Sequence, residues 1–463
     1  MPCPLNNLAA TPSSGHGMPC PYEMSTNFNA MTTATLEIAP ALDAANSADL
    51  HQPEPDASHH LEAQEPALDQ IAAVDAEFAF QNYGQRLPVA FSHGAGVEIW
   101  DFAGKRYLDF LGGIAVTQVG HAHPRVVEAI ARQAASVMHV SNYFYIAPQV
   151  ELAKRLSALS YGFRAFFCNS GAEANEAALK LTRKFHHDAG HGDKIEVVTV
   201  WKSFHGRTLG VLGATGNENY HKGFAPLPSG HVLVALNDVS ALEAAFSKRT
   251  AAFMLEPILG ESGILMPSAE CVSKAREVCD NFGALLIFDE VQAGNGRTGK
   301  FWAHEWFETV PDIITTAKGL ANGVPIGAML AREEIAAHLT PGSHGTTFGG
   351  NFLASAAALA TLDVIKDENL MQNAADVGAY FMEQLRAWGN QTGAVKEVRG
   401  RGLMIGCELH QPKARELMKC SLQNGLIFNA VGDSILRFLP PLVVSHSQVD
   451  EAMAILDDAW AKL

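Results

Sequence analysis

Short apolar runs alternate with longer stretches of helical periodicity between about residues 165 and 331. Short and nearly continuous apolar runs are typical of strands buried on both faces of a sheet, and the stretches between them are long enough for crossover helices. The alternation predicts an α/β fold with a mostly parallel sheet. The predicted strands are Ala165–Cys168, Glu196–Val200, Ala251–Leu255, Ala284–Phe288, Ile313–Thr316 and Gly327–Ala331.

The flanking segments predict further elements. Val97–Trp100 and Arg106–Phe110 are typical of a small hairpin, because a Gly-containing turn separates them. Arg125–Met138 and Val150–Leu159 have helical spacing. After residue 350 we expect a helix over Leu353–Lys366, another through Trp388, and strands at Val395–Arg399, Leu403–Leu409 and Leu436–Phe438. These later elements indicate a second, α+β domain.

The charge is distributed unevenly along the chain. The net charge is −16, and the first 75 residues carry ten acidic side chains and no Lys or Arg. A segment without basic residues is unlike a secretory signal or a mitochondrial transit peptide. Residues 1–72 are predicted to be a disordered acidic tail, because they are polar and show little periodicity. Nothing indicates the basic surface that nucleic-acid binding needs.

Other global features favour a protein of the cytoplasm. The chain has no uninterrupted apolar stretch of about 18 residues, so no membrane span is expected. Seven cysteines are scattered without a CxxC pair or a disulfide spacing, which favours a reduced, cytoplasmic protein. Cys168 lies close to the candidate site described next, but a small buried cysteine is expected to pack rather than react.

Two of the predicted strands end at an ionisable residue. One apolar run stops at Asp289, and the next stops at Lys318. Parallel strands present their carboxyl ends at one edge of a sheet, so both side chains are expected there. Each residue alone could be a helix cap or a surface lysine. Together they suit a pyridoxal phosphate enzyme, in which the amine binds the cofactor covalently and the carboxylate keeps the pyridine nitrogen protonated.

Three further segments fit that chemistry. Gly171 and Ala172 follow a predicted strand and open a helix, whose N-terminal N–H groups attract an anion such as phosphate. Phe204 could lie against a flat ring, and Arg207 could bind a carboxylate with two hydrogen bonds. The Gly-rich loop Gly345–Gly350 carries two hydroxyl groups suited to phosphate or substrate oxygens.

Two other motifs suggest different chemistry. Gly294–Gly299 fits the G-x-G-x-x-G pattern, but a dinucleotide site needs a helix to begin there, and none is predicted. His186, His187, Asp188 and His191 resemble metal ligands, yet they are expected in a solvated polar loop after a helix end rather than in a zinc site. We therefore predict neither a dehydrogenase nor a metal centre.

From about Phe78 to Leu463 the chain resembles the class III aminotransferases of the fold-type I pyridoxal phosphate group. Seven blocks in the family order carry this resemblance. They are Gly120–Pro124, Phe167–Glu176, Phe204–Thr208, Leu255–Glu261, Phe288–Gln292, Thr316–Leu320 and His344–Gly350. The resemblance implies a seven-stranded, mostly parallel sheet in a large domain, a smaller α+β domain and a homodimer with shared active sites.

The resemblance also implies the domain boundaries. After the tail, residues 73–130 would form the N-terminal segment of the small domain. Residues 131–351 would form the large cofactor-binding domain, and residues 352–463 the rest of the small domain.

The resemblance assigns roles in holding pyridoxal phosphate. Lys318 would be the Schiff-base lysine and proton shuttle, Asp289 would pair with the pyridine nitrogen, and Phe204 would stack on the ring. The other implied cofactor-binding residues are Gly171, Ala172, Glu290, Val291, Gln292 and, from the partner subunit, Thr347.

The implied reaction transfers the ω-amine of N2-acetylornithine to 2-oxoglutarate. Arg207 would bind the α-carboxylate of the donor, with Thr346 nearby from the other subunit. Glu261 and Arg437 would form a switch that is closed for the ω-amine donor and open for glutamate. Thr346 and Phe348 stand where the family usually has Ser and Tyr.

Related activities remain open. Succinylornithine, ornithine and 4-aminobutyrate are alternative donors of the same chemical type. A pyridoxal phosphate-dependent aminomutase shares the fold, but it would have no need for the Glu261–Arg437 pair, because it uses no external keto acid.

Overall fold

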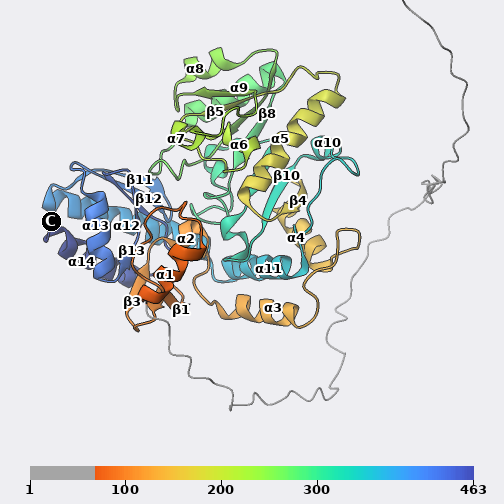
Figure 1. The fold of residues 1–463 in the computed structure, drawn as a ribbon. Coiled ribbons are helices and arrows are strands. Elements are labelled where there is room, and N and C mark those ends of the chain that lie inside the picture. The colour runs from red at the N-terminus through yellow and green to blue at the C-terminus, as the bar shows by residue number, and fades with distance from the viewer. Residues whose placement is uncertain (1–67) are drawn as a thin grey trace, which may run out of the picture. The chain divides into compact units, whose positions relative to one another are not determined.

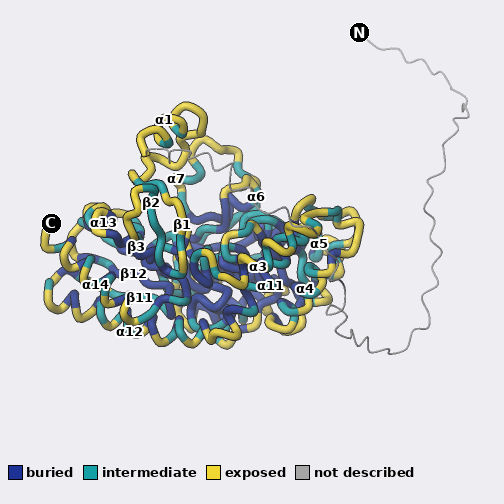
Figure 2. Tube along the Cα trace, turned by 90° about the horizontal axis from the view of Figure 1, so that it is seen from below, coloured by how far each residue is buried: buried dark blue, intermediate teal, exposed yellow. Residues whose placement is uncertain are grey.

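The structure, a computed structural model, describes residues 68–463 (Figure 1). The expected disorder of residues 1–67 lies outside this range. The end of that tail is corrected, because helix α1 (Leu68–Phe78) begins before residue 72. None of its residues is buried, and Figure 2 shows it as an exposed projection. No helix within residues 68–463 is long and apolar enough to cross a membrane.

A seven-stranded sheet forms the centre of the larger part of the molecule. In spatial order its strands are β4 (Arg164–Cys168), β10 (Gly327–Ala331), β9 (Ile313–Thr316), β8 (Leu285–Asp289), β7 (Thr250–Leu255), β5 (Glu196–Val200) and β6 (His231–Val234). Strands β9, β8, β7, β5 and β6 run parallel, and β10 runs antiparallel to both of its neighbours. The predicted strands and the mostly parallel sheet are confirmed.

Both faces of this sheet are buried, which explains the continuous apolar runs. Leu286 and Phe288 pack on one side with the residues of α8 and α9, whereas Leu285 and Ile287 pack on the other side with those of α5. The helices of this part are α3 (Pro124–Ala134), α4 (Ala147–Ala158), α5 (Gly171–Asp188), α6 (Leu209–Leu212), α7 (Glu218–His221), α8 (Val239–Ala245), α9 (Ala269–Phe282), α10 (Glu333–Ala336) and α11 (Phe352–Asp367).

The smaller part of the molecule, built from N-terminal and C-terminal segments, contains two four-stranded sheets. One has the order β1 (Phe91–Ala95), β2 (Glu98–Asp101), β3 (Arg106–Asp109) and β13 (Leu426–Ile427). The other has the order β11 (Val395–Arg401), β12 (Met404–Leu409), β15 (Ile435–Phe438) and β14 (Asn429–Val431). Helices α12 (Leu370–Thr392), α13 (Ala414–Gln423) and α14 (His446–Trp460) complete this part, and the short helix α2 spans Gly112–Ala115.

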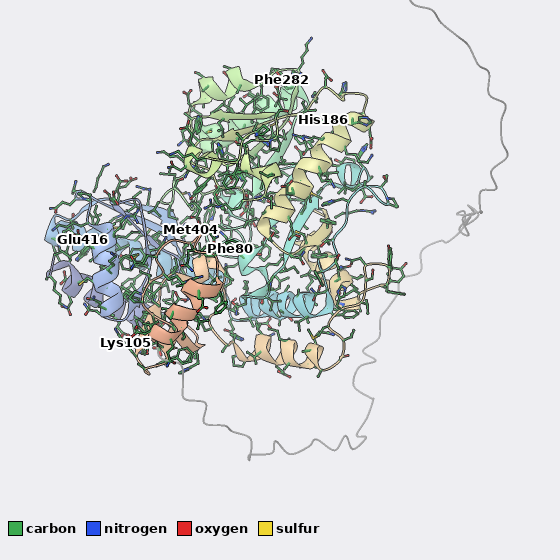
Figure 3. The ribbon with its side chains drawn as sticks, in the orientation of Figure 1. Phe80, Lys105, His186, Phe282, Met404 and Glu416 are labelled. Carbon is green, nitrogen blue, oxygen red and sulfur yellow. The ribbon has the colours of Figure 1, made fainter. Side chains whose placement is uncertain are left out.

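One hydrophobic cluster joins the N-terminal hairpin to the C-terminal elements. Leu108 and Phe110 pack in it with Phe381, Phe438 and residues of α14. The expected boundary at residue 130 falls inside α3, so no natural break exists there. Met404, labelled in Figure 3, belongs to a smaller cluster with residues of both parts. The remaining domain boundaries stay a prediction.

Candidate active site

A cavity of about 350 Å³ lies at the edge of the large sheet where β8 and β9 end. Many of the predicted site residues line it. They are Gly171, Ala172, Phe204, Arg207, Glu261, Asp289, Val291, Gln292 and Lys318. The sheet therefore brings together residues that are up to about 150 positions apart in the sequence, as expected for the carboxyl edge of a parallel sheet.

Asp289 is the last residue of β8 and lies on the floor of the cavity. Its carboxylate is only 3% exposed, yet it accepts three hydrogen bonds. Asn175 Nδ2 and His205 Nδ1 donate to Oδ2 over 2.7 and 2.8 Å, and the Val291 N–H donates to Oδ1 over 3.1 Å. A buried carboxylate needs such hydrogen-bond partners to offset its loss of contact with water. Asp289 is thus fixed in one orientation.

Lys318 follows β9 and has a left-handed backbone, with φ of +44°. A left-handed conformation is unfavourable for a residue with a Cβ atom, so neighbouring contacts must hold it. Burial lowers the pKa of the Lys318 ammonium, while Glu261 raises it and Arg437 lowers it further. A lowered pKa increases the fraction of neutral amine, which is the nucleophilic form.

The loop after β4 caps the start of α5 at the edge of the cavity. The Ser170 hydroxyl accepts a hydrogen bond from the Glu173 N–H, and the Glu173 carboxylate accepts one from the Asn169 N–H. This reciprocal pair caps the helix, so it begins at Gly171 and leaves the N–H groups of Gly171 and Ala172 available at the cavity. The predicted helix N-terminus is confirmed.

Arg207 lines the cavity and packs against two aromatic rings. Its guanidinium carbon lies 5.4 Å from the centre of the Phe204 ring and 3.6 Å from that of Tyr220. Cation–π contact with Tyr220, which the sequence analysis did not identify, orients the guanidinium without neutralising it. Arg207 keeps its charge available for a carboxylate.

Glu261 and Arg437 form a closed ion pair. Arg437 Nη1 lies 2.8 Å from Glu261 Oε1, and Gln292 Nε2 donates to the same oxygen over 3.1 Å. Arg437 is fully buried, and its other hydrogen bonds go to the Gly260 carbonyl and to Asn429 Oδ1. Burial alone would raise the pKa of Glu261, but Arg437 and Lys318 together hold it below its usual value.

Glu290 does not line the cavity, and its expected role in binding the cofactor stays a prediction. Successive residues at a strand end point in opposite directions, so the Glu290 carboxylate turns away from the cavity. It accepts hydrogen bonds from the N–H groups of Ala303 and His304 and pairs with the His304 ring at 2.8 Å. Glu290 therefore caps the 3₁₀ helix η2 (Ala303–Phe307).

Thr346 and Thr347 do not line this cavity within one chain. They line a neighbouring hollow with His139, Asn142 and Tyr143. Thr346 Oγ1 accepts a hydrogen bond from Asn169 Nδ2 over 3.3 Å. The roles expected for these two residues from a partner subunit stay a prediction.

Sequence analysis missed Glu256, a buried acid at the end of β7. Its carboxylate accepts hydrogen bonds from the N–H groups of Phe204 and Gly260. Burial raises the pKa of Glu256 to about 7, with His205 lowering it and Asp289 raising it. The sequence pattern that identified Asp289 also applies to Glu256, because the apolar run Ala251–Leu255 ends at this acid.

The two rival motifs are placed elsewhere. Gly294–Gly299 forms consecutive turns, and no dinucleotide-binding helix starts there. His186, His187 and Asp188 lie in the last turn of α5 rather than in a loop, which corrects their predicted position. His187, Asp188 and His191 are exposed, as predicted for a solvated segment, whereas His186, labelled in Figure 3, is buried and its ring hydrogen-bonds to the Ala251 carbonyl over 2.8 Å. Among residues 68–463 no group of ligands could hold a metal ion.

The family model described as aminotransferase class-III matches residues 79–460.

The chain belongs to the class III aminotransferase family. Acetylornithine aminotransferase of Methanocaldococcus jannaschii is 46% identical over 390 residues, which cover 84% of this chain and 98% of that protein.

Solved structures of aminotransferases share the fold. Ornithine aminotransferase from Toxoplasma gondii has a TM-score of 0.82 and 33% identity, covering 86% of this chain and 96% of that one. N-acetylornithine aminotransferase from Stenotrophomonas maltophilia has a TM-score of 0.72 and 36% identity, covering 82% and 98%. The class III enzyme described here depends on pyridoxal phosphate, as the family does.

The donor set of the cavity fits this cofactor. The α5 N-terminus suits its phosphate, the Asp289 carboxylate suits its pyridine nitrogen, and the Lys318 amine suits its aldehyde. Phe204 lies in the same cavity and can face a flat ring.

Proposed function

We propose that this aminotransferase transfers the ω-amine of N2-acetylornithine to 2-oxoglutarate, giving N-acetylglutamate 5-semialdehyde and glutamate, a step of arginine biosynthesis. The closed Glu261–Arg437 pair next to an available Arg207 carries the proposal. N2-acetylornithine has one carboxylate, far from the reacting carbon, so one free guanidinium suffices. Relatives named acetylornithine aminotransferase support the choice of donor.

Each residue has a defined task in this reaction. Bound pyridoxal phosphate supplies a ring that withdraws electrons from the substrate carbon. Asp289 would hold a proton at the pyridine nitrogen, and Lys318 Nζ would take the proton from the amine-bearing carbon of the substrate and pass it to the cofactor carbon that receives the amine. Arg207 fixes the distance between the donor carboxylate and the reacting amine.

The alternative donors differ mainly at the far end of the molecule. Ornithine has a free α-amine, succinylornithine a larger acyl group, and 4-aminobutyrate a shorter chain. Initial rates with these three donors and N2-acetylornithine, each with 2-oxoglutarate, test the proposal. Acetylornithine should give the highest kcat/KM. A higher kcat/KM for another donor would show that this other donor is the substrate.

Removing the charge of Glu261 should affect the two half-reactions unequally. In Glu261→Ala the unpaired Arg437 repels the donor ammonium, yet it still binds the α-carboxylate of glutamate. We expect the ω-amine half-reaction to fall about 10-fold or more relative to the glutamate half-reaction, since one charge-assisted contact contributes roughly 1.5–3 kcal/mol. Single-turnover rates of each half-reaction measure this ratio.

Glu261→Gln is the matched control, because it keeps a hydrogen-bond acceptor for Arg437 without the charge. A charge switch predicts that this variant resembles Glu261→Ala. Equal losses in both half-reactions would show that Glu261 is structural.

We also infer a homodimer in the cytoplasm with active sites shared between subunits. Thr346 and Thr347 do not line the cavity of their own chain, although they belong to a block that matches the family. The same region exposes large apolar side chains, among them Tyr143 at 94% and Tyr145 at 98%. Such exposure is typical of an interface. The cysteines at 168, 271, 279, 407 and 420 are free, which supports a reducing compartment.

Mixing two inactive variants tests the shared sites. Lys318→Ala lacks the amine, and a Thr346→Ala/Thr347→Ala variant lacks the loop hydroxyls. A mixed dimer should regain one intact site, so activity should rise toward about one quarter of wild type at equal amounts, provided that subunits mix at random. Absence of recovery when native mass spectrometry shows mixed dimers would contradict sharing.

A further inference from the structure

The turn at Gly294–Gly299 forms a buried polar network beside Lys318. Asn295 Nδ2 donates hydrogen bonds to Thr316 Oγ1 over 3.0 Å and to the Ala317 carbonyl over 3.2 Å. Asn295 and Thr316 are both at most 1% exposed. The contact to Ala317 fixes the orientation of the amide, because a carbonyl can only accept a hydrogen bond.

Gln118 extends the network to the other side of Lys318. Its Nε2 donates to the Asn295 carbonyl over 2.7 Å. Its side chain also packs against Gly319, where an added Cβ atom would lie 2.8 Å from Gln118 Oε1. The network therefore contacts the residues immediately before and after Lys318.

Arg297 anchors the network to the C-terminal part of the chain. Its Nη2 donates to Gln118 Oε1 over 2.7 Å, and its Nη1 donates to the carbonyls of Leu403 and Pro440. Pro440 lies three residues after Arg437. The same hydrogen-bonded chain thus joins the backbone around Lys318 to the end of the strand that carries Arg437.

A contribution to stability does not explain why an arginine is buried at position 297. It is fully buried, and none of its hydrogen bonds goes to a carboxylate among residues 68–463. Buried charges are costly, and apolar side chains in their place are often equally stable or more so. Polar groups with fixed directions, by contrast, can hold a backbone in a conformation that it would otherwise leave.

We propose that Asn295, Gln118 and Arg297 are positioning residues that hold Lys318 in its left-handed conformation, so that its amine is presented to the cofactor. Asn295 donates a hydrogen bond to the carbonyl of Ala317, the residue before Lys318. Gln118 packs on the glycine that follows Lys318, and Arg297 holds Gln118 in place. The network touches no residue of the donor-binding pocket at Arg207, so the inference holds whichever amine donor the enzyme uses.

Asn295→Gly removes the amide while preserving the backbone, because Asn295 has φ of +58° and glycine adopts such angles freely. Asn237→Gly is the matched control. Asn237 also has a positive φ, 65°, and its amide also donates to a backbone carbonyl, that of Met266, but it lies on an exposed loop away from the cavity.

The first measurement is the rate at which each apoenzyme attaches pyridoxal phosphate to Lys318. Aliquots are quenched with borohydride at timed intervals, and the labelled Lys318 peptide is quantified by mass spectrometry. We expect Asn295→Gly to attach the cofactor about 100-fold more slowly, as a misplacement of about 1 Å costs. Asn237→Gly should match wild type, and a wild-type rate for Asn295→Gly would overturn the proposal.

The second measurement separates positioning of Lys318 from support of the whole cavity. Equilibrium binding of pyridoxal phosphate is compared between Lys318→Ala and the double variant Lys318→Ala/Asn295→Gly. Equal affinities are expected, because the network acts through Lys318. A loss of affinity in the double variant would overturn the proposal in favour of general support.

Thr316→Val serves if Asn295→Gly does not fold, as judged by circular dichroism. It removes one acceptor of the Asn295 amide and keeps the side-chain volume. Attachment should slow in the same direction by a smaller factor, and an unchanged rate in Thr316→Val would then count against the network.

Discussion

Lys318→Ala is expected to abolish covalent attachment of pyridoxal phosphate and to reduce turnover by at least about 10⁴-fold, because the variant loses both the nucleophilic amine and the group that moves the proton. Lys318 is the only lysine among the residues that line the cavity. Borohydride reduction of the wild-type enzyme followed by peptide mapping should label Lys318. Steady-state rates with N2-acetylornithine measure the loss of turnover.

Lys419→Ala on α13 is the matched control, because Lys419 is exposed and lies outside the cavity. It should retain the label and the wild-type rate. Label on another lysine, or substantial turnover in Lys318→Ala, would contradict the assignment.

Lys318→Ala should not lower the stability of the apoenzyme. Burial lowers the pKa of Lys318 in the folded state, so folding disfavours its charged form at neutral pH. A lysine whose folded pKa lies below its unfolded value opposes folding below that pH, and the opposition fades as the pH rises toward the unfolded value. The melting temperature of Lys318→Ala apoenzyme at pH 7 should therefore equal or exceed that of wild-type apoenzyme.

The sequence predicted the large sheet and its functional edge because burial on both faces leaves continuous apolar runs. Ile313–Thr316 and Gly327–Ala331 were placed at the bounds that the structure has. Asp289 and Lys318 were found because each interrupts such a run at its end. Position at the end of a buried strand thus predicts both the edge and the chemistry.

Features that depend on the direction of a strand or of a side chain were harder to predict from the sequence. β10 has the composition of its parallel neighbours but runs antiparallel, because the direction of a strand depends on its connection. Glu290 follows Asp289 directly, and only the geometry shows that its carboxylate turns toward His304. β6 was missed because its residues are only partly buried at the sheet edge.

Contacts between distant segments were not predictable from spacing. Gln118 and Asn295 are 177 residues apart, and neither belongs to a catalytic pattern. Gly294–Gly299 fits the pattern of a dinucleotide site, whereas in the structure the Asn295 side chain of this segment donates a hydrogen bond to the Ala317 carbonyl next to Lys318. A single sequence gives no signal for such pairing, because each residue by itself is an ordinary polar loop residue.

Asp289→Asn is expected to keep the cofactor but to lose on the order of 10²–10³-fold in turnover, the usual loss when one charge-stabilising group is removed from an active site. A neutral amide cannot hold a proton at the pyridine nitrogen as a carboxylate does. The variant retains Lys318 and the α5 N-terminus, so covalent attachment should persist. Reduction with borohydride and single-turnover rates on the same sample separate these two effects.

The hydrogen bonds of Asp289 add a structural consequence to that loss. All three of its partners, Asn175 Nδ2, His205 Nδ1 and the Val291 N–H, donate to the carboxylate. An amide presents one oxygen and one NH₂ group, so in either orientation its NH₂ faces at least one donor, whichever ring nitrogen of His205 carries the proton. Buried polar groups left without a partner cost about 1–3 kcal/mol. Asp289→Asn should therefore also lower the melting temperature of the apoenzyme, whereas Asp289→Glu keeps the charge and should recover part of the turnover. Wild-type turnover in Asp289→Asn would show that the carboxylate does not act on the cofactor ring.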